Sequence, residues 1–303
     1  MTDCIKIQIP ASSSNLGAGF DCFGLALDLY NEYIFNFTSS GFKANSNLDE
    51  NIFVNNKKNL VFKSFSHLYK KLCKNKMPGI DLELKAQIPS CGGFGSSSTA
   101  VLAGLLAANK FLGNKLSVEE ILLEAANIEG HADNVCASML GAFCLVSFFN
   151  NKLHYKKINW NLDLKILMLY PENFRVNTNE ARKVIQKKQK LENCIFNIAN
   201  AALFTSAVLT NDLDTFQKSV QDKIHEEARL NLIPNATEII DFANNNNAIA
   251  ATISGSGASL IVFVKDTKDA EIIENYAKEK WLEKDIVSKS LKCRVSNSGA
   301  LVY

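Results

Sequence analysis

The sequence predicts an α+β protein with two domains. A chain of 303 residues has the length of one large or two ordinary domains. Several segments alternate apolar and polar residues, as half-buried strands do, while others repeat apolar residues with a helical period. The 47% hydrophobic and 21% charged residues are typical of a folded chain and exclude a disordered or fibrous one.

The composition also narrows the class of partner. The formal charge of +2 and the dispersed lysines give no field that would hold a polyanion, so we expect no nucleic acid. The longest near-continuous apolar stretch, 100–108, is about half of what a spanning helix needs, so we expect no membrane partner. The N-terminal residues alternate and carry Asp3, unlike a secretory signal. A cytoplasmic location is therefore expected.

The cysteines and histidines favour neither disulfides nor zinc. The eight cysteines form no CxxC pair, which indicates reduced thiols. The four histidines lie apart from them, without zinc-ligand spacing. Any metal is therefore expected to be a hard cation bound by oxygen ligands.

The first half of the chain predicts strands and helices in alternation. Alternating residues predict strands at 5–9 and 31–38, and the small, polar segment 11–21 between them predicts a loop. A helical period covers 59–74, and alternation returns at 80–88. After a Gly/Ser-rich loop at 89–99, an Ala/Leu-rich helix runs from 100 to Gly113. Ser117 and Glu120 form a capping box for a helix that runs to Glu129 and stops at Gly130.

A hairpin with strands at 143–149 and 154–158 ends the first half of the chain. The second half begins with a buried strand at 164–170. The boundary lies near 157–163, giving domains at 1–158 and 159–303. Helices are predicted at 179–189, 194–209, 213–224, 236–243 and 269–281. Strands are predicted at 248–253, at 260–264 and near 294–295, and a second glycine cluster occupies 254–259.

The loop at 89–99 has the composition of a phosphate site. Gly92, Gly93 and Gly95 lack the Cβ atoms that would keep an anion from the backbone N–H groups, and the following helix adds its N-terminal partial charge. The loop lacks the lysine of a Walker A sequence and the third glycine of a dinucleotide fingerprint. From these residues alone, phosphate binding and a tight connecting turn both remain open.

Other polar residues each allow two interpretations. His131 with Asp133 suits acid/base chemistry or a helix cap. Glu129 suits Mg²⁺ ligation or a solvated helix end. Arg182 and Arg229, scarce arginines in a lysine-rich chain, suit a carboxylate or phosphate clamp or ordinary surface ion pairs. No GxSxG sequence supports serine hydrolysis.

Three segments together carry a resemblance to a known family. PASSSNLGAGFDCFG at 10–24, PSCGGFGSSSTA at 89–100 and SGSGAS at 254–259 resemble the three signature motifs of the GHMP kinase superfamily. EGHADNV at 129–135, NTNEAR at 177–182 and EEARLNLIP at 226–234 are most similar to the homoserine kinases within it. These segments span most of the chain in the family's order.

The resemblance implies a two-domain fold with the active site between the domains. The N-terminal domain would be a βα sandwich-like ATP domain, and the C-terminal domain a ferredoxin-like α/β domain. The reaction would be transfer of the ATP γ-phosphoryl group to the side-chain hydroxyl of L-homoserine, giving O-phospho-L-homoserine in threonine biosynthesis, with Mg²⁺ as cofactor. The family also implies a homodimer.

The resemblance also assigns candidate residues. Asn134 would position the hydroxyl, with Asp133 as the rival for a base role. Ser98 and Glu129 would hold Mg²⁺. The substrate-binding residues would be Asn15, Asp21, His131, Thr178, Arg182 and Arg229. The ATP-binding residues would be Asn59, Pro89, Ser90, Cys91, Gly92, Gly93, Phe94, Gly95, Ser96, Ser97, Ser98 and Thr99.

Two alternatives remain open at this point. A different GHMP kinase of small alcohols, such as a mevalonate kinase, would share the loops, although mevalonate has no amine to pair with Asp21. A non-catalytic, ATP-binding relative would act through protein contacts. Turnover of an acceptor alcohol distinguishes all three.

Overall fold

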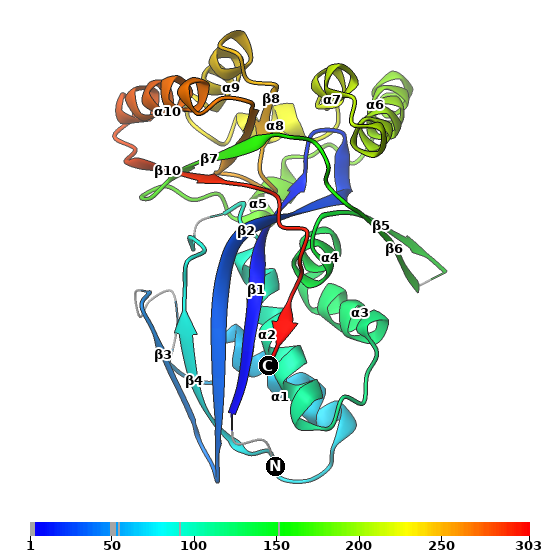
Figure 1. The fold of residues 1–303 in the computed structure, drawn as a ribbon, viewed down its shortest axis with the longest axis vertical. Helices are drawn as coiled ribbons and strands as arrows, with labels where there is room; N and C mark the ends of the chain where they lie inside the picture. Colours follow the sequence, from blue (N-terminus) through cyan, green and yellow to red (C-terminus); the bar gives the residue numbers. More distant parts are fainter. Residues whose placement is uncertain (1–3, 49–52, 54, 91, 151) are drawn as a thin grey trace.

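The computed structural model describes residues 4–48, 53, 55–90, 92–150 and 152–303. The chain forms two lobes, one above the other in Figure 1, each built on its own β-sheet. Both lobes combine helices with a sheet, and the first sheet carries seven strands among the residues described. The α+β fold class expected from the sequence is therefore confirmed.

The sheet of the lower lobe is built around a long hairpin. Its strands run in the order β11-β1-β2-β4-β3, and β5 pairs with β2 and with β6. The strands are β1 (Cys4–Asn15), β2 (Gly19–Thr38), β3 (Phe42–Ser46), β4 (Gly79–Lys85), β5 (Phe143–Phe149), β6 (Lys152–Ile158) and β11 (Leu301–Val302). The strands predicted at 5–9, 31–38, 80–88 and in the 143–158 hairpin are confirmed.

The loop predicted at 11–21 is wrong. Most of that segment continues β1 and β2, which stay paired from Ala11 opposite Leu27 to Asn15 opposite Gly19. The usual apolar alternation is missing there because Ser12, Ser13 and Ser14 are buried, and hydrogen bonds satisfy their hydroxyls. The strand is therefore polar where it enters the interior, and periodicity does not reveal it.

Four helices cover one face of this sheet (Figure 1). They are α1 (Leu60–Leu72), α2 (Ser96–Phe111), α3 (Val118–Glu129) and α4 (Asp133–Leu140). The capping box of Ser117 and Glu120 is present, and Gly130 ends α3 in the left-handed conformation. Helix α2 is buried nearly all round and lies so close to α1 that a Cβ on Gly104 would come within 2.3 Å of the Val61 carbonyl oxygen. The short α4 was not predicted.

The upper lobe is an antiparallel sheet in the order β10-β7-β9-β8. Its strands are β7 (Lys165–Pro171), β8 (Ala250–Ile253), β9 (Leu260–Val264) and β10 (Ser288–Cys293). Helices α9 (Ala236–Asn245) and α10 (Thr267–Leu282) share one apolar core with it, and α6 (Leu191–Thr210) and α7 (Leu213–Ser219) share another. The short helices α5 (Thr178–Lys183) and α8 (Glu226–Leu230) also belong to this lobe, and α5 lies next to the lower lobe in Figure 1.

Three predicted bounds in this lobe are wrong. The helix predicted at 179–189 ends at Lys183, because Ala181 is the one residue of this helix that is buried and Val184, the C-cap, is exposed, so little packing supports a further turn. The helix predicted at 213–224 ends at Ser219, because the Asp222 carboxylate accepts the N–H groups of Ile224, His225 and Glu226 and starts a new turn. The strand predicted near 294–295 is β10, which ends at Cys293; Val295 forms only an isolated bridge.

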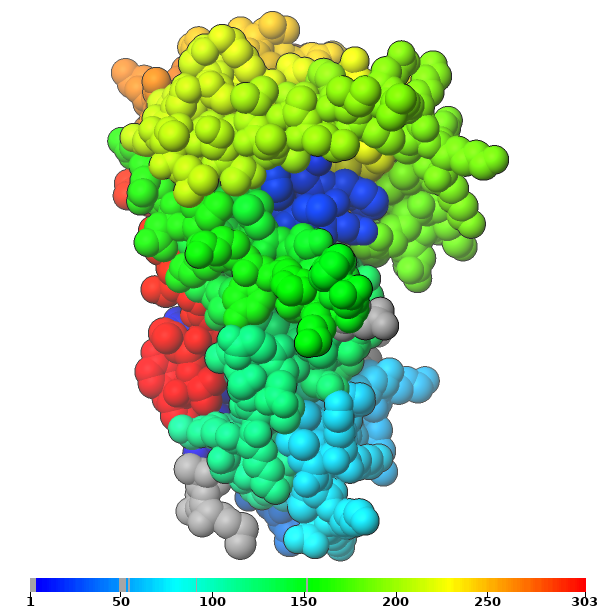
Figure 2. All heavy atoms as spheres, turned by 90° about the vertical axis from the view of Figure 1, so that its right-hand side faces the viewer, coloured from blue at the N-terminus to red at the C-terminus, as the bar shows by residue number. Residues whose placement is uncertain are grey.

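The two lobes exchange segments of chain. The tip of the β1–β2 hairpin enters the upper lobe, where Leu16 and Phe23 join the core that contains Phe204 and Phe216. In Figure 2 a blue surface, which belongs to the N-terminal part of the chain, lies between the two lobes. In the opposite direction, β11 returns to the lower sheet and pairs with β1 at Ile7 and Gln8. Each lobe is therefore completed by residues from the far end of the chain.

Helix α6 is the one described helix whose length and composition would suit a membrane span. Its most apolar window is 28% buried, since Phe204, Ala207 and Val208 pack into the core while Leu191 and Ile198 are exposed. A single helix of this kind is weak evidence for a membrane, because core helices pass the same test.

Candidate active site

A cavity of about 470 Å³ lies where the lobes meet. Strand β1 and the start of β2 contribute Ser14, Asn15 and Asp21, and the first turn of α4 contributes Asp133 and Asn134. The upper lobe closes the cavity with residues of α5, α8 and the loop after β8, namely Thr178, Arg182, Arg229, Gly255 and Ser256. The predicted substrate-binding residues, distant in sequence, therefore line one cavity.

The glycine-rich loop before α2 forms another wall. Gly95 has a φ of +64°, and a Cβ built on it would lie 2.1 Å from the Ser12 hydroxyl oxygen. A Cβ on Gly92 would lie 2.1 Å from the Gly257 carbonyl oxygen in the second glycine loop. Only glycine fits at these two contacts, so the loop packs directly against both lobes.

Hydrogen bonds from the second glycine loop hold the first. The Ser254 hydroxyl donates to the Gly93 carbonyl oxygen, and the Ser259 hydroxyl donates to the Gly92 carbonyl oxygen at 2.5 Å. Ser12 of β1 donates its N–H to the Phe94 carbonyl oxygen. With its carbonyl groups bound in this way, the loop is braced in one conformation at the N-terminus of the long helix α2.

The predicted nucleotide residues divide into two groups. The cavity is lined by Asn59, Ser90, Gly92, Gly93, Gly95, Ser96 and Ser97. Phe94 instead points into the core and packs edge-on to Tyr170, and Thr99 is buried with its hydroxyl 2.9 Å from that of Tyr33. Ser98 is also buried, and Pro89 is half-buried. Cys91 lies outside the described residues.

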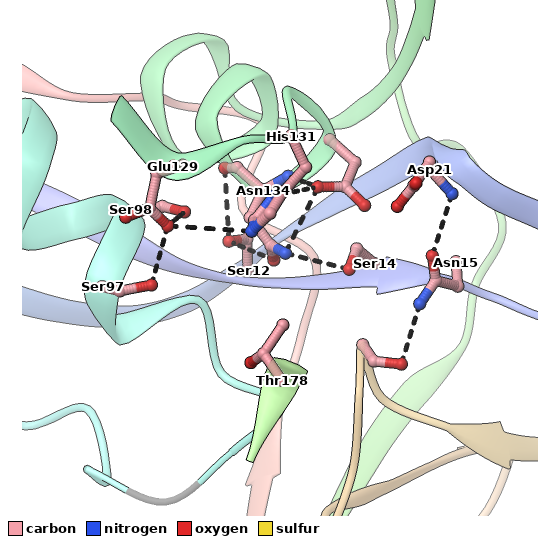
Figure 3. A network of polar contacts seen from close by, with 12 residues as sticks. Ser12, Ser14, Asn15, Asp21, Ser97, Ser98, Glu129, His131, Asn134 and Thr178 are labelled. Atoms are coloured by element: carbon pink, nitrogen blue, oxygen red, sulfur yellow. Dashed lines mark hydrogen bonds and ion pairs between the residues drawn. The ribbon is translucent and has the colours of Figure 1, made fainter. Parts of the chain in front are cut away.

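The carboxylate of Glu129 faces the first turn of α2. Its Oε2 accepts hydrogen bonds from the hydroxyls of Ser97 at 2.7 Å and Ser98 at 3.0 Å (Figure 3). The side chain is 7% exposed, and His131 Nε2 lies 3.8 Å from the same oxygen. A nearly buried carboxylate beside two hydroxyls is an oxygen-rich corner of the kind that Mg²⁺ prefers.

His131 lies between two carboxylates. Its Nδ1 is 2.8 Å from Asp133 Oδ1, while Glu129 lies beyond the other ring nitrogen. Burial by itself would lower the pKa of His131, but the hydrogen bond and charge of Asp133, with the charge of Glu129, raise it above its ordinary value. The imidazole therefore carries a positive charge more readily than a free histidine.

Asn134 is held in one orientation by serines of β1. Its Oδ1 accepts from the Ser12 hydroxyl at 2.9 Å, and its Nδ2 donates to the Ser14 hydroxyl at 2.9 Å (Figure 3). The Ser138 hydroxyl in turn donates to that of Ser12. The sequence motif contains these serines, but only the continuation of β1 as a strand aims them at Asn134.

Asp21 and Arg182 form an ion pair across the cavity. Arg182 Nη1 lies 2.8 Å from Asp21 Oδ2, and Nη2 lies 2.8 Å from Oδ1. The backbone N–H of Asp21 donates to Asn15 Oδ1, and Asn15 Nδ2 donates to the Gly255 carbonyl oxygen at 2.8 Å. The hydrogen bond and charge of Asp21 raise the pKa of Arg182 above its ordinary value.

Arg229 is a buried cation at the cavity wall. It is 1% exposed, and its guanidinium donates to the carbonyl oxygens of Ala181 and Gly255 and lies 3.4 Å from His225 Nδ1. Burial, followed by the charge of Arg182, lowers the pKa of Arg229 to about 10. Among the ion pairs of the described residues none includes Arg229, so this charge is available to an anion.

The far end of the cavity is apolar. It is lined by Leu48, Phe53, Leu60, Val61 and Leu84, with Asn31 and Tyr33 nearby. Asn59 Oδ1 accepts from the N–H groups of Val61 and Phe62 and caps α1. Sequence reasoning missed this apolar wall, because its residues come from separate elements. It also missed Arg175, which makes three of the four arginines line the cavity.

Comparisons with known proteins agree with this geometry. Models of the GHMP kinase N-terminal domain and of the GHMP kinase C-terminal domain match residues 59–142 and 204–283. The chain is 34% identical to a homoserine kinase of Clostridium beijerinckii, over 98% of each chain. It is 34% identical to one of Caldicellulosiruptor saccharolyticus, over 99% of this chain and 96% of the relative.

Solved structures extend the comparison. A homoserine kinase from Cytophaga hutchinsonii superimposes with a TM-score of 0.85 and 29% identity, covering 100% of this chain and 98% of that one. A mevalonate kinase from L. major, at 18% identity and a TM-score of 0.73 over 96% of each chain, shares the fold.

Proposed function

We propose a role for each part of the cavity from the premise that this chain belongs to the homoserine kinase family of the GHMP kinases. The reaction is a phosphoryl transfer to an alcohol: ATP phosphorylates the side-chain hydroxyl of L-homoserine, in the pathway to threonine. The observation that carries the assignment of roles is that one cavity joins a braced glycine loop to a pair of arginines and an aspartate.

ATP occupies the end of the cavity next to α2. Its phosphates lie on the N–H groups of the loop at 92–95, where the helix terminus adds attraction for anions. Its base lies against the apolar wall near Asn59, because an aromatic base needs flat apolar contact and the cavity offers that surface only there. Pro89, Phe94 and Thr99 act through the backbone or through packing.

Magnesium belongs beside Glu129. The hard, oxygen-rich corner of Glu129 and Ser98 fits the ion, and Ser97 contributes a further hydroxyl. When bound, the ion neutralises charge on the phosphates of ATP. Glu129 Oε2 also lies 3.8 Å from His131 Nε2, so the metal and the imidazole would share one carboxylate.

L-Homoserine occupies the opposite end. Arg229 and Arg182 bind its carboxylate, because each guanidinium can donate two aligned hydrogen bonds to a carboxylate. Asp21 and Asn15 bind its ammonium group. Thr178, whose hydroxyl lies 3.3 Å from that of Ser256, closes the site from above. This placement directs the side-chain hydroxyl toward His131 and Asn134.

Asn134 positions the reacting hydroxyl. The two serines on β1 fix its amide, so it can hold the hydroxyl in line with the γ-phosphorus without being ionised. Asp133, the rival base, already accepts from His131 and from the Asn134 N–H through Oδ1. The hydroxyl oxygen forms the new bond to phosphorus, ADP leaves, and the proton passes to a phosphate oxygen or to water.

A panel of acceptors tests this substrate assignment. The purified protein should release ADP from Mg-ATP with L-homoserine and far more slowly with D-homoserine, L-threonine, mevalonate or galactose. A reaction without acceptor measures background hydrolysis. Preference for mevalonate would overturn the roles of Asp21 and Asn15, and silence with every acceptor would favour a non-catalytic relative.

The remaining assignments concern the whole protein. We expect a cytoplasmic homodimer that acts on small molecules, without nucleic-acid or membrane partners. We place the lobe boundary between residues 158 and 159, since β6 ends at Ile158 and β7 begins in the other sheet at Lys165. Light scattering of the purified protein gives the oligomeric state, and cell fractionation gives the location.

A further inference from the structure

The Asp21–Arg182 ion pair presents a conflict within the substrate site. Both carboxylate oxygens of Asp21 accept from Arg182, each at 2.8 Å. The same two side chains are those assigned to the ammonium and the carboxylate of the substrate. Asp21 and Arg182 therefore bind each other through the same groups that they would use to bind the substrate.

The pair is held in a site that is neither dry nor fully open. The side chain of Arg182 is 35% exposed and that of Asp21 is 38% exposed. The two residues come from different lobes, Asp21 from β2 and Arg182 from α5. The ring of Phe20 lies 5.8 Å from the Arg182 guanidinium carbon and 5.0 Å from that of Arg229. Phe20 therefore holds both guanidinium groups near the cavity even when the ion pair of Asp21 with Arg182 is broken.

We propose that this ion pair is a placeholder that selects zwitterionic α-amino acids. An α-amino acid carries an ammonium and a carboxylate on one carbon, so it can replace one internal pair by two pairs with the protein. A ligand with only one charge breaks the internal pair and leaves one member without a partner. The inference rests on the proposed function and explains how the site enforces it.

Two analogues of the substrate separate the placeholder from simple recognition. 4-Hydroxybutanoate lacks the ammonium group, and 3-aminopropan-1-ol lacks the carboxylate. In the wild-type protein both must compete with the internal pair. If the only role of Asp21 were to attract the ammonium group, removal of the Asp21 carboxylate would leave the affinity for 4-hydroxybutanoate unchanged.

The decisive variant is Asp21→Asn. Asp21 has a φ of 56°, a left-handed conformation that asparagine adopts readily, so the backbone of the hairpin tip is retained. Loss of the carboxylate removes the competitor for Arg182. We expect the inhibition constant of 4-hydroxybutanoate to fall about three- to tenfold, while the KM of L-homoserine rises about tenfold or more.

The reciprocal variant is Arg182→Gln, measured with 3-aminopropan-1-ol. Loss of the guanidinium frees Asp21, so the inhibition constant of this amine should fall by a similar factor while the KM of L-homoserine rises. Asp28→Asn is the matched control, because Asp28 is also on β2 but exposed, with its Oδ1 accepting the Arg294 N–H. It should change neither analogue. Thermal unfolding of each variant confirms that it is folded.

The outcomes separate this inference from the proposed function. Tighter 4-hydroxybutanoate together with weaker L-homoserine in Asp21→Asn supports the placeholder. An unchanged or weaker 4-hydroxybutanoate with weaker L-homoserine overturns the placeholder and keeps Asp21 as the ammonium ligand. An unchanged KM of L-homoserine in both variants overturns the assignment of Asp21 and Arg182 themselves.

Discussion

At the scale of single residues, Arg229 shows how a binding group is prepared. Its guanidinium is buried and is fixed by two carbonyl oxygens and by His225. Burial also lowers the pKa of His225, whose Nε2 lies 2.9 Å from the Gly17 carbonyl oxygen and whose Nδ1 lies 3.4 Å from Arg229 Nη1. The desolvation of the arginine has already occurred before a carboxylate arrives, which favours binding of that anion.

Arg229→Ala should therefore raise the KM of L-homoserine by about 10- to 100-fold, the equivalent of one or two charge-assisted hydrogen bonds of ~1.5 kcal/mol each. The KM of ATP should change little, because the partner assigned to Arg229 is the carboxylate of homoserine and not ATP. Steady-state kinetics with each substrate varied in turn measures both values. Arg294→Ala, an exposed arginine outside the cavity, is the control. An unchanged KM of homoserine would remove Arg229 from the site.

Glu129→Gln tests the magnesium corner. The amide keeps an oxygen for the hydroxyls of Ser97 and Ser98 but loses the negative charge that a divalent cation needs. The Mg²⁺ concentration for half-maximal activity should rise about tenfold or more at fixed ATP. Glu119→Gln changes the same helix at an exposed position and should have no effect. If Glu129→Gln leaves the titration unchanged, the metal binds elsewhere.

At the scale of elements, the loop before α2 depends on glycine for two separate reasons. Gly95 has both a positive φ and a neighbour too close for a Cβ, namely Ser12. Gly113, at the end of α2, has a φ of +84° but nothing within 4 Å of a built Cβ. A side chain at either position would therefore strain the backbone, but only a side chain at Gly95 would also collide with a neighbour.

This difference makes Gly95→Ala and Gly113→Ala a matched pair. Both should lose about 1 kcal/mol of stability from the left-handed conformation. Only Gly95→Ala should also displace Ser12 and the loop, and we expect its kcat/KM for ATP to fall at least about tenfold, or ~1.4 kcal/mol in transition-state stabilisation. Unfolding curves and ATP kinetics on both variants separate the two effects. Equal ATP kinetics would contradict a role for the close contact.

The elements differ in how well the sequence predicts them. The capping box of Ser117 and Glu120 and the hairpin of β5 and β6 are local patterns, and both were predictable. The polar half of β1 was not, because its serines satisfy their hydroxyls through partners more than a hundred residues away. The motifs pointed to residues that line the cavity, but not to the turn of Phe94 and Thr99 into the core or to the ion pair of Asp21 with Arg182.

At the scale of the whole molecule, a second cavity lies beside α8 in the upper lobe. It is lined by Asp222, Glu226, Glu227 and Asp241, among others. Glu226 Oε1 accepts from the Thr252 hydroxyl at 2.6 Å and from the Ile253 N–H. Burial raises the pKa of Glu226 to about 7, although its hydrogen bonds oppose the shift. The acid therefore titrates near neutral pH in the folded state.

This shift predicts a loss of stability with rising pH. Because the folded pKa of about 7 is above the ordinary value of 4.5, the folded protein binds the proton more tightly, and the stabilisation is complete below pH 4.5 and lost as pH rises through 7. Glu226→Gln should raise the free energy of unfolding by about 1 to 2 kcal/mol at pH 8 relative to its effect at pH 5. Denaturant unfolding at both pH values measures this. Glu227→Gln, at an exposed neighbour, should give no such difference.

The contact between the two glycine loops has a consequence for engineering. Gly92 and Gly93 lie so close to Ser254, Gly257 and Ser259 that neither loop has room to vary alone. A chimera that takes residues 89–99 from one relative and 254–259 from another would combine two loops whose packing contacts do not match. Libraries meant to alter nucleotide preference should therefore randomise both loops jointly, because productive changes in one will be hidden until the other accommodates them.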